Sequence, residues 1–345
     1  MSSGRRMRLT ASLFALTLMS LGLLAPQPSR AQTPGIYISA GDSIAAGIGA
    51  SLPRERGNGA LVAGWLEALT GATVPFENLA VPGETAASFI SGGQLQRLRD
   101  TVTRANTAEI PVLAVTLSLG GNELLGLEAD GLADRQAGLD DFRRRYDEAV
   151  AAIREAVGDD TPIIVLTYYN LTGGDPGIQF SDAWWIEQFN ETIRSVAATH
   201  AASLADLPDR FAGRIDQLTH YPFDVHPSNA GHAEIARAIW SSIALDTESP
   251  TVTIESNLDA TRSTPTVRFM VADNVGVRAV TIESEEVAFH GPFETAAGEY
   301  AVLLDVEAGE TTEVALTIEI SDDAGNVTTE DVTVRFAEAS GGETP

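Results

Sequence analysis

The chain has 345 residues, is 44% hydrophobic and contains no cysteine, so disulfides, thiolate metal sites and a cysteine nucleophile are excluded. Its formal net charge is −26, and all 22 Lys and Arg positions are arginines. Such an excess of negative charge predicts a surface that keeps the protein soluble and repels nucleic acid and anionic lipid. At this length we expect two domains and a processed end.

Residues 1–31 have the pattern of a secretory signal peptide. Three arginines precede an apolar run over residues 9–25, and the small residue Ala31 offers a cleavage site. The alternative, a membrane anchor, needs about 18 uninterrupted apolar residues, and threonine and serine interrupt this run. We therefore expect secretion from a bacterium and no stable membrane insertion after cleavage. Loss of the four arginines of this segment would take the net charge from −26 to −30.

Residues 32–246 alternate short apolar runs with amphipathic stretches, the pattern of a parallel sheet covered by helices. The predicted strands are Ile36–Ala40, Phe76–Val81, Val112–Leu119, Ile163–Tyr169 and Ser203–Leu207. The predicted helices are Ala60–Leu69, Ala86–Val102, Asp140–Val157, Asp182–His200 and Ala230–Ile243, the last capped by Ser228. This order predicts an α/β domain.

Residues 247–338 change to an alternation of threonine, valine and isoleucine with polar residues. The predicted strands are Thr251–Ser256, Thr266–Ala272, Ala279–Glu283, Glu299–Val306, Glu313–Ser321 and Asp331–Phe336. They predict a small all-β sandwich, followed by a disordered tail at 339–345. This region resembles bacterial immunoglobulin-like modules, notably at 272–274 and 321–326. The Asp and Asn residues there fit turn formers, and a calcium site is the alternative.

The first candidate site residue is Ser43. Ligands of open α/β sheets bind beyond the carboxyl ends of the strands. Gly41-Asp42-Ser43 follows the first predicted strand and places a hydroxyl at a strand-to-helix turn, with its own N–H near a helix N-terminus. By itself the tripeptide is common turn chemistry. The Gly-x-Ser-x-Gly signature is absent around it, which argues against the α/β-hydrolase fold.

Two further segments offer hydrogen-bond donors at the same edge of the sheet. Gly83 follows the second strand and can present its N–H without a side chain in the way, or can simply form a helix-entry turn. Asn122 follows the third strand, and its neutral carboxamide can donate a hydrogen bond to an oxyanion but does not itself ionise.

A candidate base precedes the last predicted helix. His226 offers an imidazole, the usual base for a serine hydroxyl, because histidine side chains as a type take and return a proton near neutrality. His226 stands before Pro227, whereas His232 lies within the helix pattern. For an isolated histidine, a hydrogen-bonded structural role is the commoner one.

Together these segments resemble the GDSL/SGNH hydrolase family, whose blocks are Gly-Asp-Ser, a glycine, Gly-x-Asn and Asp-x-x-His-Pro, in that order. The resemblance covers Gly35–Leu245 and implies a flavodoxin-like three-layer α/β/α fold. It also implies Ser43 as nucleophile, His226 as general base then acid, and an oxyanion hole of the Ser43 N–H, the Gly83 N–H and the Asn122 side chain. The implied mechanism requires no metal and no cofactor.

The acid of the triad departs from the family pattern. The family places it three residues before the histidine, where this chain has Phe223, and Asp224 is only two residues before. Either the loop bends so that Asp224 orients His226, or a backbone carbonyl near Phe223 does so and leaves a Ser-His dyad. Asp206 and Asp216 are the remaining candidates.

The resemblance implies an esterase or lipase-like enzyme (EC 3.1.1) that acts on esters of short to medium acyl chains, lipid-like or carried on a glycan. Tyr168, Tyr169 and the pair Trp184-Trp185 could line an acyl or sugar pocket or pack in the core. Removal of acetyl groups from extracellular polysaccharide is the alternative, because secretion and an appended sandwich suit a polymer degrader. A non-catalytic surface-binding protein is a third reading.

Overall fold

The computed structural model describes residues 35–127, 130–255, 259–260, 266–305 and 313–336. The predicted signal peptide at 1–31 and the predicted tail at 339–345 lie outside these residues. Among the described helices, every one is too short or too polar to cross a lipid bilayer.

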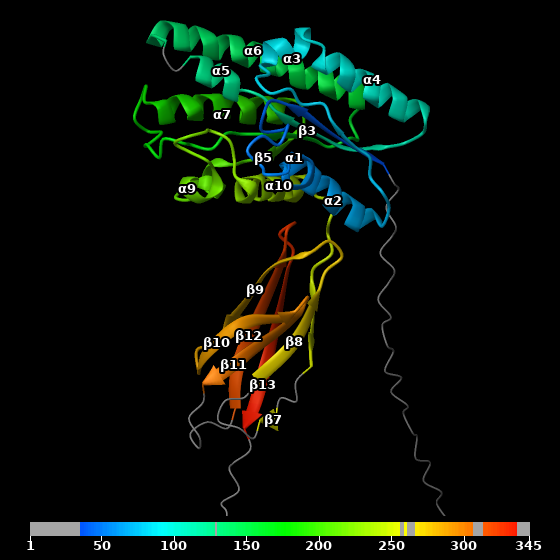
Figure 1. Cartoon of the computed structure of the whole chain (residues 1–345), viewed down its shortest axis with the longest axis vertical. Coiled ribbons are helices and arrows are strands. Elements are labelled where there is room, and N and C mark those ends of the chain that lie inside the picture. The colour runs from blue at the N-terminus through cyan, green and yellow to red at the C-terminus, as the bar shows by residue number, and fades with distance from the viewer. Residues whose placement is uncertain (1–34, 128–129, 256–258, 261–265, 306–312, 337–345) are drawn as a thin grey trace, which may run out of the picture. The chain divides into compact units, whose positions relative to one another are not determined.

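A five-stranded parallel sheet forms the centre of the first region (Figure 1). Its strands are β1 (Ile36–Gly41), β2 (Phe76–Asn78), β3 (Val112–Ser118), β4 (Ile163–Leu166) and β5 (Ser203–Ala205). Their spatial order is β2-β1-β3-β4-β5, the flavodoxin-like order. In this order β2 lies on one side of β1, and the later strands are added on the other side, beginning with β3. The predicted α/β fold class is confirmed. A ligand is expected beyond the carboxyl ends of β1 and β3, where the strand order reverses.

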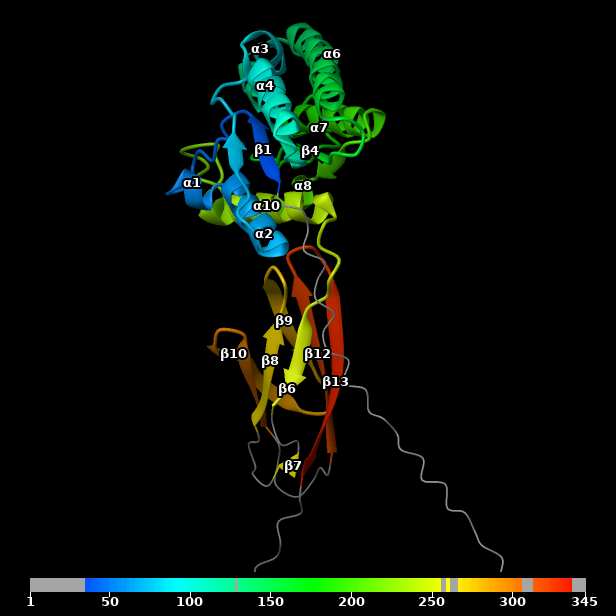
Figure 2. The ribbon, with the colours of Figure 1, turned by 90° about the vertical axis from the view of Figure 1, so that its right-hand side faces the viewer.

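Helices cover both faces of this sheet, as Figures 1 and 2 show. The helices are α1 (Pro53–Arg56), α2 (Asn58–Thr70), α3 (Ala86–Ser91), α4 (Gln94–Thr107), α5 (Gly121–Gly126), α6 (Leu132–Val157), α7 (Asp182–Thr199), α8 (Pro208–Phe211), α9 (Ile215–Leu218) and α10 (Asn229–Ile243). One layer contains α3, α4, α6 and α7, and the other contains α2 and α10. Because both faces are covered, Ile38, Val115 and Ile164 are completely buried.

The helix predicted over Ala86–Val102 is wrong as a single element. It is two helices, α3 and α4, separated by Gly92 and Gly93. Gly93 has a φ of 93°, a left-handed conformation that a continuous helix does not contain and that glycine adopts at no steric cost. By contrast, the predicted cap of α10 is confirmed, since the Ser228 hydroxyl accepts a hydrogen bond from the Gly231 N–H at 3.3 Å.

The second region is a pair of four-stranded sheets with the orders β10-β11-β8-β6 and β7-β13-β12-β9. The strands are β6 (Thr251–Ile254), β7 (Asp259–Ala260), β8 (Thr266–Ala272), β9 (Val277–Glu283), β10 (Ala288–Ala296), β11 (Glu299–Asp305), β12 (Glu313–Asp322) and β13 (Val327–Phe336). All pairings are antiparallel except β7 with β13.

Alternating residues of the two sheets, such as Phe269, Val302 and Ile318, fill a separate hydrophobic core. The antiparallel sandwich is therefore confirmed, while its immunoglobulin-like identity and the boundaries predicted at residues 31 and 246 stay predictions. β10 was not predicted, because Gly291 and Pro292 interrupt the alternation of apolar and polar residues there.

Candidate active site

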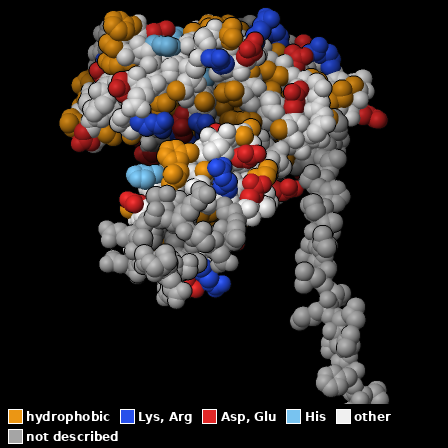
Figure 3. Space-filling model, turned by 60° about the horizontal axis from the view of Figure 1, so that its bottom comes forward, with side chains coloured by type: hydrophobic (Ala, Val, Ile, Leu, Met, Phe, Trp, Pro, Cys, Tyr) orange, Lys and Arg blue, Asp and Glu red, His pale blue; other side chains and the backbone are white. Residues whose placement is uncertain are grey.

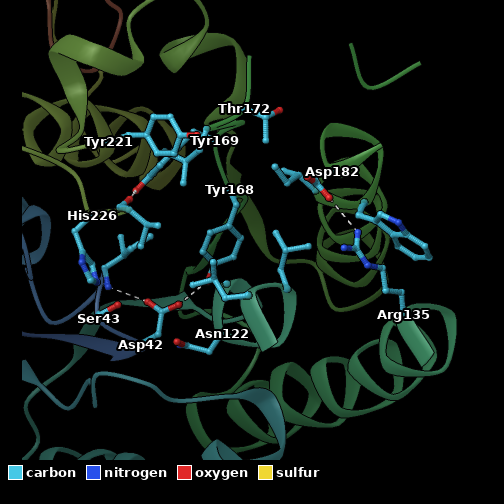
Figure 4. Close-up of a pocket in the computed structure, with 18 residues that line it drawn as sticks. Asp42, Ser43, Asn122, Arg135, Tyr168, Tyr169, Thr172, Asp182, Tyr221 and His226 are labelled. Atoms are coloured by element: carbon cyan, nitrogen blue, oxygen red, sulfur yellow. Dashed lines mark hydrogen bonds and ion pairs between the residues drawn. The ribbon is translucent and has the colours of Figure 1, made fainter. Parts of the chain in front are cut away.

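One pocket lies beyond the carboxyl ends of the parallel strands (Figure 4). Ser43 comes from the loop after β1, Asn122 from the start of α5 after β3, and His226 from the loop before α10. The structure brings these three predicted residues together in the pocket lining. Gly83 and Asp224 are not among the residues that line it.

Ser43 lies in a hydrogen-bonded turn that glycine makes possible. Gly41, the last residue of β1, has a φ of 124°, and a Cβ atom there would lie 2.0 Å from the Ser118 carbonyl oxygen. Beyond it the Ile48 N–H donates to the Ser43 carbonyl oxygen at 3.0 Å. We expected a helix here, but the segment after Ser43 is a series of turns. The seven positions from Ser43 to Gly49 contain two further glycines with positive φ, Gly47 and Gly49, which prevent a regular helix.

The Asp42 side chain fixes this turn by hydrogen bonds, a role that was not predicted from the sequence. Its Oδ1 accepts hydrogen bonds from the Ile44 N–H at 2.9 Å and the Ser118 hydroxyl at 3.0 Å, and its Oδ2 accepts one from the Tyr168 hydroxyl at 2.6 Å. The side chain is buried, and burial raises the pKa of its carboxyl group. Asp42 thus fixes the backbone on both sides of Ser43.

Asp224 lies against the imidazole of His226. The distance from Asp224 Oδ1 to His226 Nδ1 is 2.5 Å, and the same oxygen accepts from the His226 N–H at 3.2 Å. Partial burial raises the pKa of the Asp224 carboxyl group, but the hydrogen bonds from His226 outweigh it and hold the pKa below its usual value. The loop therefore bends so that an acid two residues before the histidine reaches its ring. Phe223, at the family's acid position, is 96% exposed.

The other two candidate acids lie elsewhere. Asp206 accepts from the Thr167 hydroxyl at 2.7 Å and pairs with Arg194 at 3.1 Å, while Asp216 is exposed in the first turn of α9. Neither contacts His226 in the part of the chain that the structure describes.

Neighbouring residues fix the loop that carries His226. The Tyr169 hydroxyl donates to the Val225 carbonyl oxygen at 2.8 Å, and the His220 N–H donates to the His226 carbonyl oxygen at 3.0 Å. His232 is fully buried under the Ser43 turn, with its Nε2 2.9 Å from the Ile48 carbonyl oxygen. Burial lowers the pKa of His232 to about 4, so this histidine is neutral near pH 7 and has the structural role.

Asn122 faces the pocket with part of its carboxamide engaged. Its Nδ2 donates to the Glu84 carbonyl oxygen at 2.8 Å, which leaves the second hydrogen of the amide group for a ligand. Glu84 follows Gly83, whose φ of 86° belongs to the turn closed by the Glu84 N–H and the Val81 carbonyl oxygen. The structure therefore places Gly83 next to the partner of Asn122, although outside the pocket lining.

A buried amide joins the end of β1 to the loop after β2, and no sequence pattern predicted it. Gln94 is completely buried at the start of α4. Its Oε1 accepts from the Gly41 N–H at 2.6 Å, and its Nε2 donates to the Gly41 carbonyl oxygen at 3.0 Å and to Glu84 Oε2 at 2.6 Å. One side chain thus links the backbone of Gly41 to the carboxylate of Glu84.

Away from Ser43 the pocket wall is largely apolar. Tyr168, Tyr169 and Trp185 line it, which is one of the two roles considered for them, whereas Trp184 does not. The remaining apolar lining consists of Ile44, Leu124, Leu125, Leu171, Ile186, Tyr221 and Val225. Arg135 and Asp182, paired at 3.1 Å, lie at the opposite end of the pocket from Ser43 and His226 (Figure 4).

A flavodoxin-order sheet that carries serine, asparagine and histidine in one pocket is the arrangement of the SGNH-type ester hydrolases. The chain belongs to the GDSL-like lipase/acylhydrolase family, whose family model matches residues 39–234, more than half of the chain. The resemblance inferred from the four sequence segments is confirmed at this level, and with it the class of enzyme.

Several solved structures are similar to part of this chain. Axe2, an acetylxylan esterase from Geobacillus stearothermophilus, has 19% identity, a TM-score of 0.47 and coverage of 63% of this chain and 97% of its own. The lipase Lip_vut3 from a goat rumen metagenome has 20% identity, a TM-score of 0.48 and coverage of 60% and 97%. TesA has 21% identity, a TM-score of 0.43 and coverage of 61% and 98%. The search of curated proteins found no match.

Proposed function

We propose that the protein is a serine esterase that hydrolyses carboxylic esters with short to medium acyl chains through an acyl-serine intermediate. The observation that carries this proposal is a single pocket in which Ser43, Asn122 and His226 lie at one end of an apolar wall. We retain secretion as part of the proposal on the sequence pattern of residues 1–31.

In the proposed reaction His226 takes the proton of the Ser43 hydroxyl as Oγ attacks the ester carbonyl carbon. The Asn122 amide and the Ser43 N–H, both from residues that line the pocket, stabilise the negative oxygen that forms. The family resemblance adds the Gly83 N–H as a third donor, although Gly83 lies outside the pocket lining. His226 then gives its proton to the departing alcohol, and a water activated by the same ring releases the acid. Asp224 holds Nδ1–H, which keeps Nε2 directed at the serine and stabilises the imidazolium.

The size and lining of the pocket support an acyl chain longer than acetyl. The cavity volume is about 190 Å³, larger than an engineered cavity of about 150 Å³ that accommodates benzene. Leu124, Leu171 and Ile186 give part of its wall an apolar surface that an acyl chain can contact.

The Arg135–Asp182 pair at the far end favours the second candidate, deacetylation of a polysaccharide. A charged pair can hold sugar hydroxyl groups, which an acyl chain does not provide. Rates on a series of p-nitrophenyl esters from acetate to decanoate, beside acetate release from acetylated xylan, distinguish the two. A maximum at butyrate to octanoate supports the first, and a preference for xylan acetate overturns it.

Replacement of the nucleophile tests the catalytic proposal. Ser43→Ala should lower kcat on p-nitrophenyl butyrate by at least about 1000-fold, because triad members act as a unit. Ser51→Ala, on the same loop, is the control that keeps its rate. Equal low rates for the wild type and Ser43→Ala would leave a non-catalytic binding protein.

The acid is tested by Asp224→Asn, with Asp216→Asn as the control. We expect kcat to fall about 100-fold, less than for a fully buried triad acid, because solvent already screens this carboxylate. Unchanged kcat for Asp224→Asn would mean that a backbone carbonyl orients His226 instead.

A further inference from the structure

Three aspartates from separate segments of the chain meet at one end of the β-sandwich. Asp246 precedes β6, Asp273 directly follows β8, and Asp322 is the last residue of β12. Each offers one carboxylate oxygen, and these oxygens lie within 4.8 Å of one another. The esterase reaction uses none of them.

Two of the three side chains are almost completely shielded from water. Asp246 is 6% exposed and Asp322 is 0% exposed. Carboxylates at such positions are costly to bury without a compensating positive charge. Burial, followed by the repulsion of neighbouring carboxylates, raises the pKa of Asp246 and of Asp273.

Unpartnered oxygens point to a ligand. Asp246 Oδ2, Asp273 Oδ1 and Asn274 Oδ1 are buried and have no hydrogen-bond partner among the described residues. The companion atoms are held: Asp246 Oδ1 accepts from Asn274 Nδ2 at 3.1 Å, and Asp273 Oδ2 accepts from the Gly276 N–H at 2.8 Å. Three fixed side chains thus each keep one acceptor atom unused, which native structures rarely tolerate without a ligand.

Asp322 is preorganised by the turn that follows it. Its Oδ1 accepts from the N–H groups of Gly325 and Asn326 at 2.7 and 2.8 Å, and its Oδ2 accepts from Asn326 Nδ2 at 2.7 Å. The carboxylate therefore keeps its position without the other two aspartates.

We propose that Asp246, Asp273 and Asp322 bind one divalent cation of the size of Ca²⁺, with Asn274 Oδ1 as a further ligand. All the available donor atoms are oxygens, which hard cations prefer. Ca²⁺–oxygen distances of about 2.3–2.6 Å allow ligands on opposite sides of the ion to stand about 4.8 Å apart, whereas Mg²⁺ at about 2.0–2.1 Å keeps several waters and tolerates less spread. A cluster in which protein side chains supply the oxygens, all within 4.8 Å of one another, therefore suits Ca²⁺, which takes more protein ligands than Mg²⁺ does.

Binding would connect the segment between α10 and β6, which contains Asp246, to the turns after β8 and β12. It would also replace the repulsion of three carboxylates by attraction to the ion. We therefore expect Ca²⁺ to raise the unfolding temperature of the sandwich.

Titration of the EDTA-stripped full chain with CaCl₂ by calorimetry tests the site. We expect one ion per chain, with a dissociation constant in the range of about 0.1–1 mM that is typical of weak extracellular calcium sites. We also expect the unfolding temperature to rise in about 5 mM CaCl₂, which would saturate such a site. The shift should be smaller in MgCl₂. Absence of binding heat and of any shift would overturn the proposal, and equal affinity for both ions would overturn its calcium selectivity.

Asp273→Asn and Asp246→Asn should each weaken Ca²⁺ binding at least about tenfold, because each removes a formal charge from the ligand set. Asp331→Asn, on an exposed part of β13, is the matched control and should bind as the wild type does. Asp322 is left in place because its hydrogen bonds shape the turn. Circular dichroism checks that the variants fold, and wild-type binding retained in both would overturn the assignment.

Discussion

At the scale of single residues, the position of the proposed nucleophile, Ser43, depends on hydrogen bonds that come from the neighbouring strands. The Tyr168 hydroxyl after β4 and the Ser118 hydroxyl at the end of β3 both donate to Asp42, whose other contacts shape the Ser43 turn. The two hydroxyl groups replace the water that a carboxylate loses on burial. The ends of three strands are thereby joined beneath one serine.

Tyr168→Phe removes one of these bonds and leaves Asp42 Oδ2 buried without its donor. We expect the free energy of unfolding to fall by about 2 kcal/mol, the range for a hydrogen bond to a carboxylate. Urea denaturation of the purified variant measures it. Tyr146→Phe is a matched control, because the Tyr146 hydroxyl is buried without a hydrogen-bond partner among the described residues. Equal losses for the two variants would contradict the role of Asp42.

At the scale of secondary-structure elements, Glu123 joins α5 to α3. Its Oε1 accepts from the Ala86 N–H in the first turn of α3 at 2.5 Å, while its Oε2 has no partner among the described residues. Burial raises the pKa of Glu123 from 4.5 to about 7. The folded protein thus binds this proton more tightly than the unfolded chain does.

This shift gives the stability a pH dependence of known sign. Below pH 4.5 Glu123 is protonated in both the folded and the unfolded protein, so it does not change the free energy of unfolding. Between pH 4.5 and about 7 Glu123 is ionised in the unfolded chain but still protonated in the folded protein, so the free energy of unfolding falls as the pH rises. Glu123→Gln keeps an acceptor for the Ala86 N–H and has no charge. It should match the wild type at pH 4 and be more stable at pH 8, by up to about 3 kcal/mol.

Urea curves at both pH values measure this difference, with the exposed Glu148→Gln as control. Parallel curves for Glu123→Gln and the wild type across this range would show that Glu123 ionises normally in the folded protein.

The sequence predicted the elements more fully than the contacts between them. The periodicity of the sequence located the five parallel strands. The candidate site residues were found from their places, Ser43 after β1, Asn122 after β3 and His226 before α10. The break at Gly93 could have been read from the Gly92-Gly93 pair. The contacts of Asp42 with Tyr168 and of Gln94 with Gly41 span 126 and 53 residues. No local pattern encodes such pairs, because they follow from the packing of the sheet.

At the scale of the whole molecule, the charge is dispersed rather than concentrated. Acidic and arginine side chains of both signs lie among apolar ones on the face in Figure 3. On α6 many pair locally, as Arg143 does with Asp140 at 2.9 Å and Arg145 with Glu148 at 3.3 Å. These exposed pairs contribute little to stability, and the net charge of −26 acts mainly on solubility.

Stability therefore rests on two hydrophobic cores, one around the parallel sheet and one between the sheets of the sandwich. Every residue that lines the pocket falls between Asp42 and His226. A chain that ends after residue 246 should consequently keep the kcat/KM of the full chain on p-nitrophenyl butyrate. Calorimetry of the full chain should show two transitions, of which the shortened chain keeps one. A folded but inactive shortened chain would mean that the sandwich contributes to the esterase site, and a single cooperative transition would mean that the two cores unfold together.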